Sequence, residues 1–230
     1  MKEYKTIGMV VAIEVDSVFK KYGNPITTKK LDGFDVFTYK INENKLLYVV
    51  KCGPGEIASA GATQFCISNL NCELILNFGI VGGLTEEMSD IATCVVDKIV
   101  HYDYDTTYID KDYVVGQYND YKDAYIPTTK KFVDMACKIE PTLKKVVCAS
   151  ADKFIGDPNK KSELHKTYNA DICEMESAGI ALTCNRCQIP MLMIKCVSDG
   201  CNSGENDFFT NFTKSANTCF DIMSKIIEKL

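Results

Sequence analysis

The chain has 230 residues, of which 46% are hydrophobic and 25% are charged. This composition excludes a disordered or fibrous protein and leaves enough chain to bury a sizeable core. The 26 Lys and Arg against 31 Asp and Glu give a net charge of −5, which argues against binding along a nucleic-acid backbone. The short basic runs at Lys29-Lys30 and Lys160-Lys161 are interpreted as solvated surface lysines.

Membrane insertion and secretion are not predicted. No apolar run reaches the roughly 18 residues of a membrane span, and the first residues show no basic region followed by an apolar one and a cleavage site. The 12 cysteines sit mostly inside apolar runs, where a reduced thiol behaves as a small hydrophobe. We therefore expect a cytoplasmic protein without a disulfide framework.

Metal binding is not predicted either. Cys184 and Cys187 form a C-x-x-C pair, but the chain has no second pair and its 2 histidines lie elsewhere. At helical spacing, one core and one surface cysteine explain the pair; a metal or redox role is the alternative.

The first half of the chain alternates strand-like and helix-like patterns. Residues 6–12 form an apolar run of strand length, and residues 34–41 and 45–51 flank a polar turn, which predicts a β-hairpin. Small and apolar residues at helical spacing predict a helix over residues 56–70. Further buried strands are predicted at residues 74–78, ending at Gly79, and at residues 94–102.

The second half continues this alternation. Helices are predicted over residues 128–138, 177–186 and 207–229, and strands over residues 145–150 and 191–197. Strands that alternate with helices indicate an α/β fold, which we expect to be a single domain over residues 1–230 with a mixed central sheet flanked by helices. In such sheets ligands bind beyond the carboxyl ends of the strands.

Two glycine-rich segments follow predicted strands, at residues 53–55 and 79–83. Neither contains the GxxxxGK[ST] pattern of a P-loop or the GxGxxG pattern of a dinucleotide-binding fold. A nucleotide cofactor is therefore not expected, and tight turns explain the glycines equally well.

Glu174 and Glu176 form the most informative acidic pair. In an extended segment, residues two apart point to the same face, so both carboxylates are expected on one side and Met175 on the other. Carboxylates among apolar neighbours are costly to bury unpaired, which favours a functional role such as accepting the hydroxyls of a vicinal diol. A structural salt bridge is the alternative.

These segments together resemble the nucleoside phosphorylase/nucleosidase superfamily, and within it the 5′-methylthioadenosine/S-adenosylhomocysteine nucleosidases. The resemblance extends along nearly the whole chain, and its most specific part is Glu174-Met175-Glu176 followed by Ser198-Asp199. The matching segments are residues 7–16, 53–63, 77–84, 150–155, 174–178 and 197–199.

The resemblance implies roles on the base side of a purine nucleoside. Asp199 is expected to act as the general acid at purine N7, and Phe154 to stack on the base. Ile155 is expected to offer its backbone to the purine edge, and Phe209 to lie beside the base and the 5′ substituent. Such an acid neutralises, by donating a proton, the negative charge that develops on the leaving purine.

The resemblance also implies roles on the sugar side. Met175 and Glu176 are expected to clamp the ribose, with Glu176 near the reacting carbon. The family's water-activating Glu aligns with Asp16, one methylene shorter, and Glu14 is the alternative base. Further substrate-binding positions carried over from the family are Ile80, Gly82, Lys195 and Ser198, where Ile80 replaces a Ser and Lys195 replaces an Arg.

Three functions remain open from the sequence. Hydrolysis, with water attacking C1′ of an adenine nucleoside that carries a small 5′ substituent, is favoured over phosphorolysis. Phosphorylases hold phosphate with arginines, and Arg186 is the one arginine of this chain. The third is a non-catalytic nucleoside-binding protein. The resemblance further implies a homodimer that binds a small-molecule purine nucleoside, and no metal or other cofactor.

Overall fold

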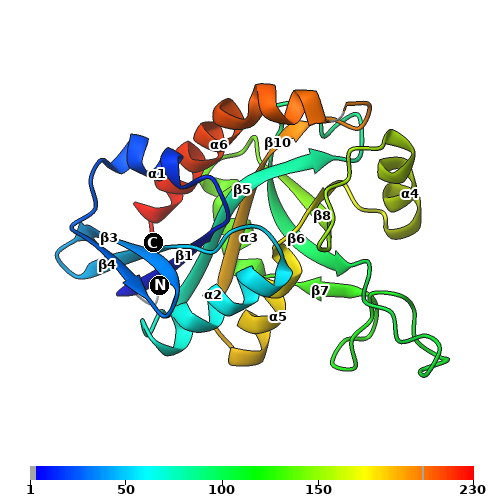
Figure 1. Cartoon of the computed structure of the whole chain (residues 1–230), viewed down its shortest axis with the longest axis horizontal. Coiled ribbons are helices and arrows are strands. Elements are labelled where there is room, and N and C mark those ends of the chain that lie inside the picture. The colour runs from blue at the N-terminus through cyan, green and yellow to red at the C-terminus, as the bar shows by residue number, and fades with distance from the viewer. Residues whose placement is uncertain (1–3, 204) are drawn as a thin grey trace.

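The computed structural model describes residues 4–203 and 205–230, and shows an α/β fold built on one mixed sheet (Figure 1). Within these residues ten strands form the sheet, which confirms the predicted fold class. The strands are β1 (Thr6–Val11), β2 (Thr27–Leu31), β3 (Phe34–Asn42), β4 (Lys45–Lys51), β5 (Leu74–Gly83), β6 (Thr93–His101), β7 (Tyr125–Pro127), β8 (Lys144–Ser150), β9 (Ile172–Glu174) and β10 (Met191–Asp199).

Helices cover both faces of this sheet. In Figure 1 the long α6 lies along one side, and α2 and α5 lie together on the opposite side. The helices are α1 (Val15–Tyr22), α2 (Glu56–Ser68), α3 (Lys130–Ile139), α4 (Pro158–Tyr168), α5 (Ser177–Cys187) and α6 (Glu205–Ile227).

The apolar pattern of β1 explains why both faces are covered. Met9 and Val11 pack into the core beneath α1, α3 and α6, whereas Val10 packs into the core beneath α2 and α5. Because successive strand residues point to opposite faces, a continuous apolar run requires a helical layer on each side.

The pairing of the strands gathers their carboxyl ends. β1 and β10 both run parallel to β5, and β10 also pairs with the antiparallel β6. The order β10-β6-β8-β9-β5 therefore closes on itself through the β10–β5 pairing. Since parallel strands end at the same edge, the residues that follow β1, β5 and β10 meet there.

Most predicted elements are confirmed to within a few residues, with one correction. The glycine segment after residue 78 is the last part of β5, not a turn, because Gly82 pairs with Asp199 and with Cys173 of β9. The hydrophobic pattern does not predict α1, β2, β7, α4 or β9, since these elements are short or mainly polar.

The structure also shows the exposure of the lysine pairs and the state of the cysteines. Lys29, Lys30 and Lys160 are exposed as expected, but Lys161 is completely buried, which corrects the interpretation of that run as solvated. All 12 cysteines are free thiols, and Cys184 is buried while Cys187 is partly exposed.

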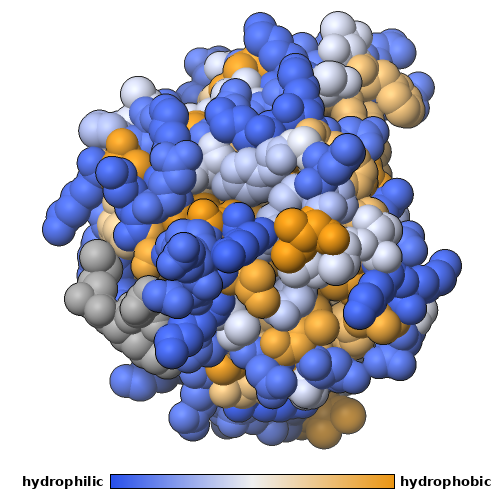
Figure 2. Space-filling model, turned by 90° about the vertical axis from the view of Figure 1, so that its left-hand side faces the viewer, coloured by the Kyte–Doolittle hydropathy of each residue, from blue (hydrophilic) through white to orange (hydrophobic). Residues whose placement is uncertain are grey.

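The surface mixes hydrophilic and hydrophobic residues. On the face shown in Figure 2 the hydrophobic residues form several separate groups among hydrophilic ones. No helix among the described residues is long and apolar enough to span a membrane.

The contact between α2 and α5 depends on Gly179. An added Cβ there would meet the backbone oxygen of Glu56 and would lie 2.8 Å from the hydroxyl of Ser59. We expect Gly179→Ala to lower the free energy of unfolding by about 1–3 kcal/mol, since the close-packed helices would have to separate. Gly61 is the matched control: it also lies in a helix, but its added Cβ would have an ordinary 3.7 Å contact.

We expect Gly61→Ala to raise the free energy of unfolding by about 0.5–1 kcal/mol through helix propensity. Urea denaturation measures both changes. Equal effects of the two substitutions would contradict the proposed close packing.

Candidate functional site

A cavity of about 170 Å³ lies at the gathered strand ends. Residues that follow β1 line it, together with the end of β5, the β9–α5 junction, the end of β10 and the beginning of α6. The lining residues are Ala12, Ile13, Glu14, Pro54, Ile80, Val81, Gly82, Phe154, Cys173, Glu174, Met175, Glu176, Ser198, Asp199 and Phe208. Residues that follow several of the strands therefore line one cavity at the edge where a ligand is expected from the sequence.

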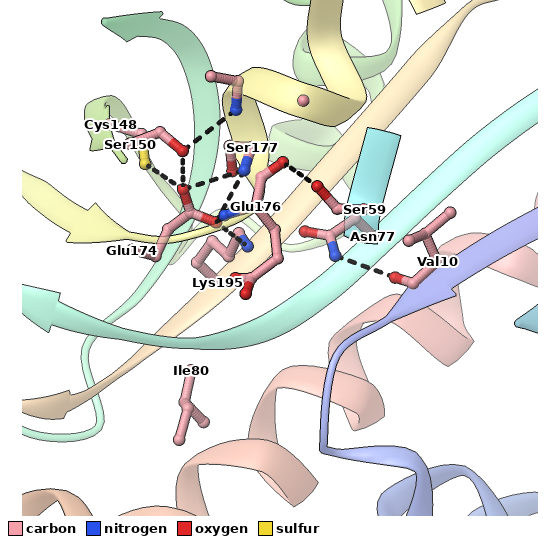
Figure 3. A network of polar contacts seen from close by, with 12 residues as sticks. Val10, Ser59, Asn77, Ile80, Cys148, Ser150, Glu174, Glu176, Ser177 and Lys195 are labelled. Carbon is pink, nitrogen blue, oxygen red and sulfur yellow. Dashed lines mark hydrogen bonds and ion pairs between the residues drawn. The ribbon is translucent and has the colours of Figure 1, made fainter. Parts of the chain in front are cut away.

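Glu174 is held in a buried network (Figure 3). Its carboxylate pairs with the Nζ of Lys195 at 3.0 Å and accepts hydrogen bonds from the hydroxyl of Ser150 at 2.6 Å and from the backbone N–H of Ser177 at 3.0 Å. Burial opposes the ionised form, but Lys195 and these donors outweigh it and hold the pKa of Glu174 below its ordinary value. Glu174 is thus a fixed anion at the back of the cavity.

Lys195 does not reach the cavity. Burial would lower the pKa of its ammonium, but the neighbouring Glu174 and Glu176 raise it above its ordinary value. The ammonium of Lys195 pairs with Glu174, and Lys195 does not line the cavity. The expectation that Lys195 contacts the substrate is corrected accordingly.

Glu176 lies beside this network with its carboxylate extending toward the side on which Ile80 lies (Figure 3). One carboxylate oxygen accepts the backbone N–H of Gly55 at 2.9 Å. Burial and the nearby charge of Glu174 raise the pKa of Glu176 to about 8. An additional partner that donates hydrogen bonds or carries positive charge would therefore be favourable here.

Met175 is not turned away from the two acids as the strand pattern predicts. β9 ends at Glu174, and Glu176 already precedes the first turn of α5, so the alternation of faces stops between them. All three residues line the cavity.

Glu56 is a further buried acid that the sequence did not single out. Its carboxyl group contacts the hydroxyl of Ser150, which Glu174 also contacts, and accepts a hydrogen bond from the backbone N–H of Gly179. Burial and the charge of Glu174 raise the pKa of Glu56 to about 7. In the sequence, Glu56 is a single acid at the start of a predicted helix. Acids are common at that position, so the sequence alone does not mark Glu56 as a buried residue.

Glu14, and not Asp16, lies in the cavity. The carboxylate of Glu14 accepts the backbone N–H of Ile80 at 3.0 Å and that of Ile13 at 3.0 Å, whereas Asp16 is exposed on the first turn of α1. Glu14 precedes α1, and the buried positions of that helix are Val15, Ser17 and Val18, so Asp16 points outward. Of the two acids left open by the sequence, the structure thus brings Glu14 to the site.

Asp199 is buried at the end of β10. Its Oδ1 accepts the hydroxyl of Ser198 at 2.7 Å, and its Oδ2 pairs with the Nζ of Lys161 at 2.7 Å. Burial raises the pKa of Asp199, and the net shift stays upward although Lys161 and Ser198 oppose it. A carboxyl with a raised pKa is suited to deliver a proton.

The aromatic residues lie at the mouth of the cavity. Phe154 is half exposed there and contacts the ring of Phe208 edge-on, with 5.3 Å between ring centroids. Phe209 is 74% exposed and outside the lining, so the expected aromatic beside the ligand is Phe208. Ile155 lines a small adjoining cavity of about 30 Å³, which also contacts Phe154 and Asp199, instead of the main one.

Among the described residues no group of three or more His, Cys, Asp or Glu side chains is arranged to hold a metal ion. The cavity instead combines apolar walls with several carboxyl groups. Such a site can hold a flat apolar ring, accept hydroxyl hydrogen bonds, and transfer protons.

Comparison with known proteins places this chain in a family. Residues 7–228 match the family model described as the phosphorylase superfamily. An aminodeoxyfutalosine nucleosidase of Campylobacter jejuni is 27% identical over 183 residues, which cover 76% of this chain and 78% of that protein. A 5′-methylthioadenosine/S-adenosylhomocysteine nucleosidase of Shewanella sediminis is 27% identical, covering 97% of this chain and 99% of that protein.

Solved structures share the fold. A Helicobacter pylori 5′-methylthioadenosine/S-adenosylhomocysteine nucleosidase, in complex with a pyrrolopyrimidine compound, has a TM-score of 0.92 at 23% identity, and the match covers 100% of both chains. The futalosine hydrolase of Helicobacter pylori has a TM-score of 0.91 at 22% identity, covering 98% of each chain.

The buried acid Glu56 predicts a pH-dependent stability. Because its pKa is raised from 4.5 to about 7 on folding, the folded protein keeps a proton between these pH values that the unfolded chain releases. The protonated Glu56 therefore contributes to the free energy of unfolding. This contribution is complete below pH 4.5 and is lost as the pH rises through about 7, at up to about 1.4 kcal/mol per pH unit. Glu56→Gln is therefore expected to lose less stability than the wild type between pH 5 and about 7.

Urea denaturation at a series of pH values measures this difference. Glu43→Gln, in the exposed turn between β3 and β4, serves as the matched control and is expected to follow the wild type. Parallel curves for Glu56→Gln and the wild type would contradict the burial of an ionisable group at this position.

Proposed function

The chain belongs to the phosphorylase superfamily, and we propose that it is an N-glycosidase that hydrolyses purine nucleosides, releasing adenine from 5′-methylthioadenosine or a related 5′-substituted adenosine. The observation that carries the proposal is the pair of buried acids at separate points of one cavity. Glu14 binds the amide of Ile80 and Asp199 pairs with Gly82, two residues further along β5. This spacing, about 7 Å of strand, leaves room for a reacting bond between an acid and a base.

Asp199 acts on the leaving base. Its carboxyl lies at the cavity wall near Phe154, whose exposed ring offers a face for stacking. Cleavage of an N-glycosidic bond places negative charge on the purine, and a proton from Asp199 to N7 neutralises it. Asp199 also accepts a hydrogen bond from a 6-amino group, which favours adenine as the base.

Glu176 and Met175 hold the sugar. The carboxylate of Glu176 accepts ribose hydroxyls, and the negative charge of Glu174, which also lines the cavity, acts on it from nearby. As positive charge develops at C1′, both carboxylates stabilise it electrostatically. The raised pKa of Glu176 shows how unfavourable an uncompensated charge is there before the ribose becomes cationic.

Glu14 activates the attacking water. It is buried, it lines the cavity, and two backbone amides fix its orientation. A carboxylate held in this way takes a proton from a water molecule directed at C1′. This role replaces the one that the resemblance gave to Asp16.

The charge of the cavity supports water over phosphate. Lys195 is buried against Glu174, and Arg186 lies in the last turn of α5, away from the lining. A phosphate dianion requires cationic donors, and beside Glu14 it would meet a carboxylate instead. Phosphorolysis, the alternative reaction in this superfamily, is therefore not favoured.

Apolar groups support a small 5′ substituent. Ile13, Pro54 and Phe208 are among the apolar residues that line the cavity. A methylthio group or a similar apolar substituent fits such walls through hydrophobic burial. The name of the related nucleosidase of Shewanella sediminis includes 5′-methylthioadenosine, which carries such a group.

We extend the proposal to the state of the protein in the cell. A single domain over residues 1–230 is supported by the continuous sheet and by the family match over residues 7–228. A homodimer is supported by strongly exposed apolar side chains at Ile57, Tyr108 and Ile109, which are 85–87% accessible. The 12 free thiols support a reducing, cytoplasmic location.

The reaction is tested directly with 5′-methylthioadenosine. We expect the wild-type protein to release adenine and the free thiosugar in phosphate-free buffer, with the same rate and products after phosphate is added. Chromatography of both products measures this. A sugar 1-phosphate would show a phosphorylase, and binding without any product would show a nucleoside-binding protein.

The choice of base is tested by a matched pair of substitutions. We expect Glu14→Gln to lower turnover by about 10²–10⁴-fold, the usual contribution of a general base, while Asp16→Asn keeps turnover near that of the wild type. Steady-state kinetics measures turnover, and thermal unfolding checks that both variants are folded. The reverse result would return the role to Asp16.

A further inference from the structure

Lys161 is a fully buried cation whose ammonium lies against the proposed acid. It projects from α4, in which Lys161 and Leu164 are the buried residues, and its side chain is 0% exposed. Its Nζ lies 2.7 Å from Oδ2 of Asp199, and the Asp199 side chain is 1% exposed. Lys161 is absent from the lining of the main cavity, so it reaches a ligand only through Asp199.

Backbone oxygens fix this ammonium on its other sides. Nζ lies 2.8 Å from the carbonyl oxygen of Gly200, 3.1 Å from that of Ser203 and 3.2 Å from that of Asp199 itself. The three N–H groups of the ammonium are therefore directed at the carboxylate and at the segment that follows β10. Lys161 joins the start of α4 to the segment that carries the acid.

The carboxyl of Asp199 is held from two sides as a result. Lys161 contacts Oδ2, and the hydroxyl of Ser198 contacts Oδ1 at 2.7 Å. An unrestrained carboxyl would rotate about its terminal bond, which has a broad preference. With both oxygens held, the remaining lone-pair directions of Asp199 are fixed relative to the cavity.

We propose that Lys161 is a positioning residue for the hydrolytic reaction, which orients the carboxyl of Asp199 toward the purine and sets the pH range in which this carboxyl is protonated. The proposal rests on the proposed role of Asp199 as the acid. A buried ion pair is weak evidence for stability, because apolar residues of similar volume are often as stable. A positioning role would explain why both charges are buried although their burial is costly.

The charges around Asp199 define the expected pH effect. Lys161 lies against Asp199 from α4, Asp90 acts from the segment before β6, and Cys173 faces it from β9. Lys161 favours the ionised form of Asp199, whereas Asp90 and burial favour the protonated form. Removal of Lys161 therefore raises the pKa of Asp199, and the alkaline limb of the rate profile moves to higher pH because the acid stays protonated longer.

Lys161→Met removes the charge and retains most of the volume. We expect kcat to fall about 10–100-fold with little change in KM, which is the effect of a misdirected catalytic group. Lys160→Met, the adjacent exposed lysine, is the matched control and is expected to behave as the wild type. Lys161→Arg keeps the charge and is expected to keep the alkaline limb closer to that of the wild type.

A double-mutant cycle separates positioning from a general structural role. If Lys161 acts through Asp199, Lys161→Met lowers kcat in the wild type but not in Asp199→Asn. An unchanged kcat and pH profile in a folded Lys161→Met, or losses that multiply in the double variant, would overturn the inference. If kcat fell in Asp199→Asn but not in Lys161→Met, Asp199 would remain the proposed acid and the positioning role of Lys161 would be rejected.

A second measurement needs neither activity nor replacement of Lys161. The ¹⁵N resonance of Lys161 Nζ is expected to shift with pH as Asp199 titrates in the wild type, and not to show this step in Asp199→Asn. The same titration curve in both proteins would overturn the coupling. If the wild type released no adenine, the proposed function would fail, and this comparison would still decide whether Lys161 and Asp199 are coupled.

Discussion

The buried ion pair of Glu174 and Lys195 is the contact on which the cavity depends. Glu174 ends β9 and Lys195 lies in β10, while Ser150 at the end of β8 donates to the same carboxylate. Backbone amides at the start of α5 complete the set. One carboxylate thus joins three strands and a helix, and removal of either charged partner would leave the other unpaired in a buried place.

Lys195 and Lys161 each pair with a different acidic group of the site. Lys195 lies behind Glu174, and Lys161 lies behind Asp199, so each carboxylate has a cation on the side away from the ligand. Glu14 and Glu176 have backbone amides as their partners instead. The pKa of Glu174, beside Lys195, is lowered, and that of Glu176, which has only a backbone amide as its bonded partner, is raised. For Asp199, burial outweighs the opposing effect of Lys161, and its pKa stays raised.

The sequence was sufficient for the elements with a strong apolar pattern. β5 and β10 are buried along almost their whole length, and their apolar runs predict them directly. α4 was not predicted because its exposed, charged residues lack helical periodicity, although Asp157 caps it by accepting the N–H of Asn159 and Pro158 begins it. Burial of a single residue, Lys161, makes this polar helix part of the site.

The composition of the site was predictable to a similar extent. Glu176, Asp199 and Phe154 follow strand ends or match a family motif, and the structure brings them together. The choice between Glu14 and Asp16 depends on where α1 begins, and that between Phe208 and Phe209 on the rotation of α6, which a sequence pattern fixes only to within a residue or two. The partners of Glu56 and Lys161 are more than 30 residues away in the chain, so no local pattern could reveal them.

The distribution of charge in the cavity connects these details to the choice of ligand. Glu14, Glu174, Glu176 and Asp199 line it, and among the described residues no basic side chain does. A phosphorylated nucleotide or a phosphate ion would enter among acidic side chains without a basic group that faces the cavity, whereas a neutral nucleoside carries no charge for them to oppose. As the glycosidic bond breaks, the sugar becomes positively charged and these carboxylates gain a partner. The unfavourable burial that raises the pKa of Glu176 in the free protein is therefore relieved most in the transition state, where a catalyst requires it.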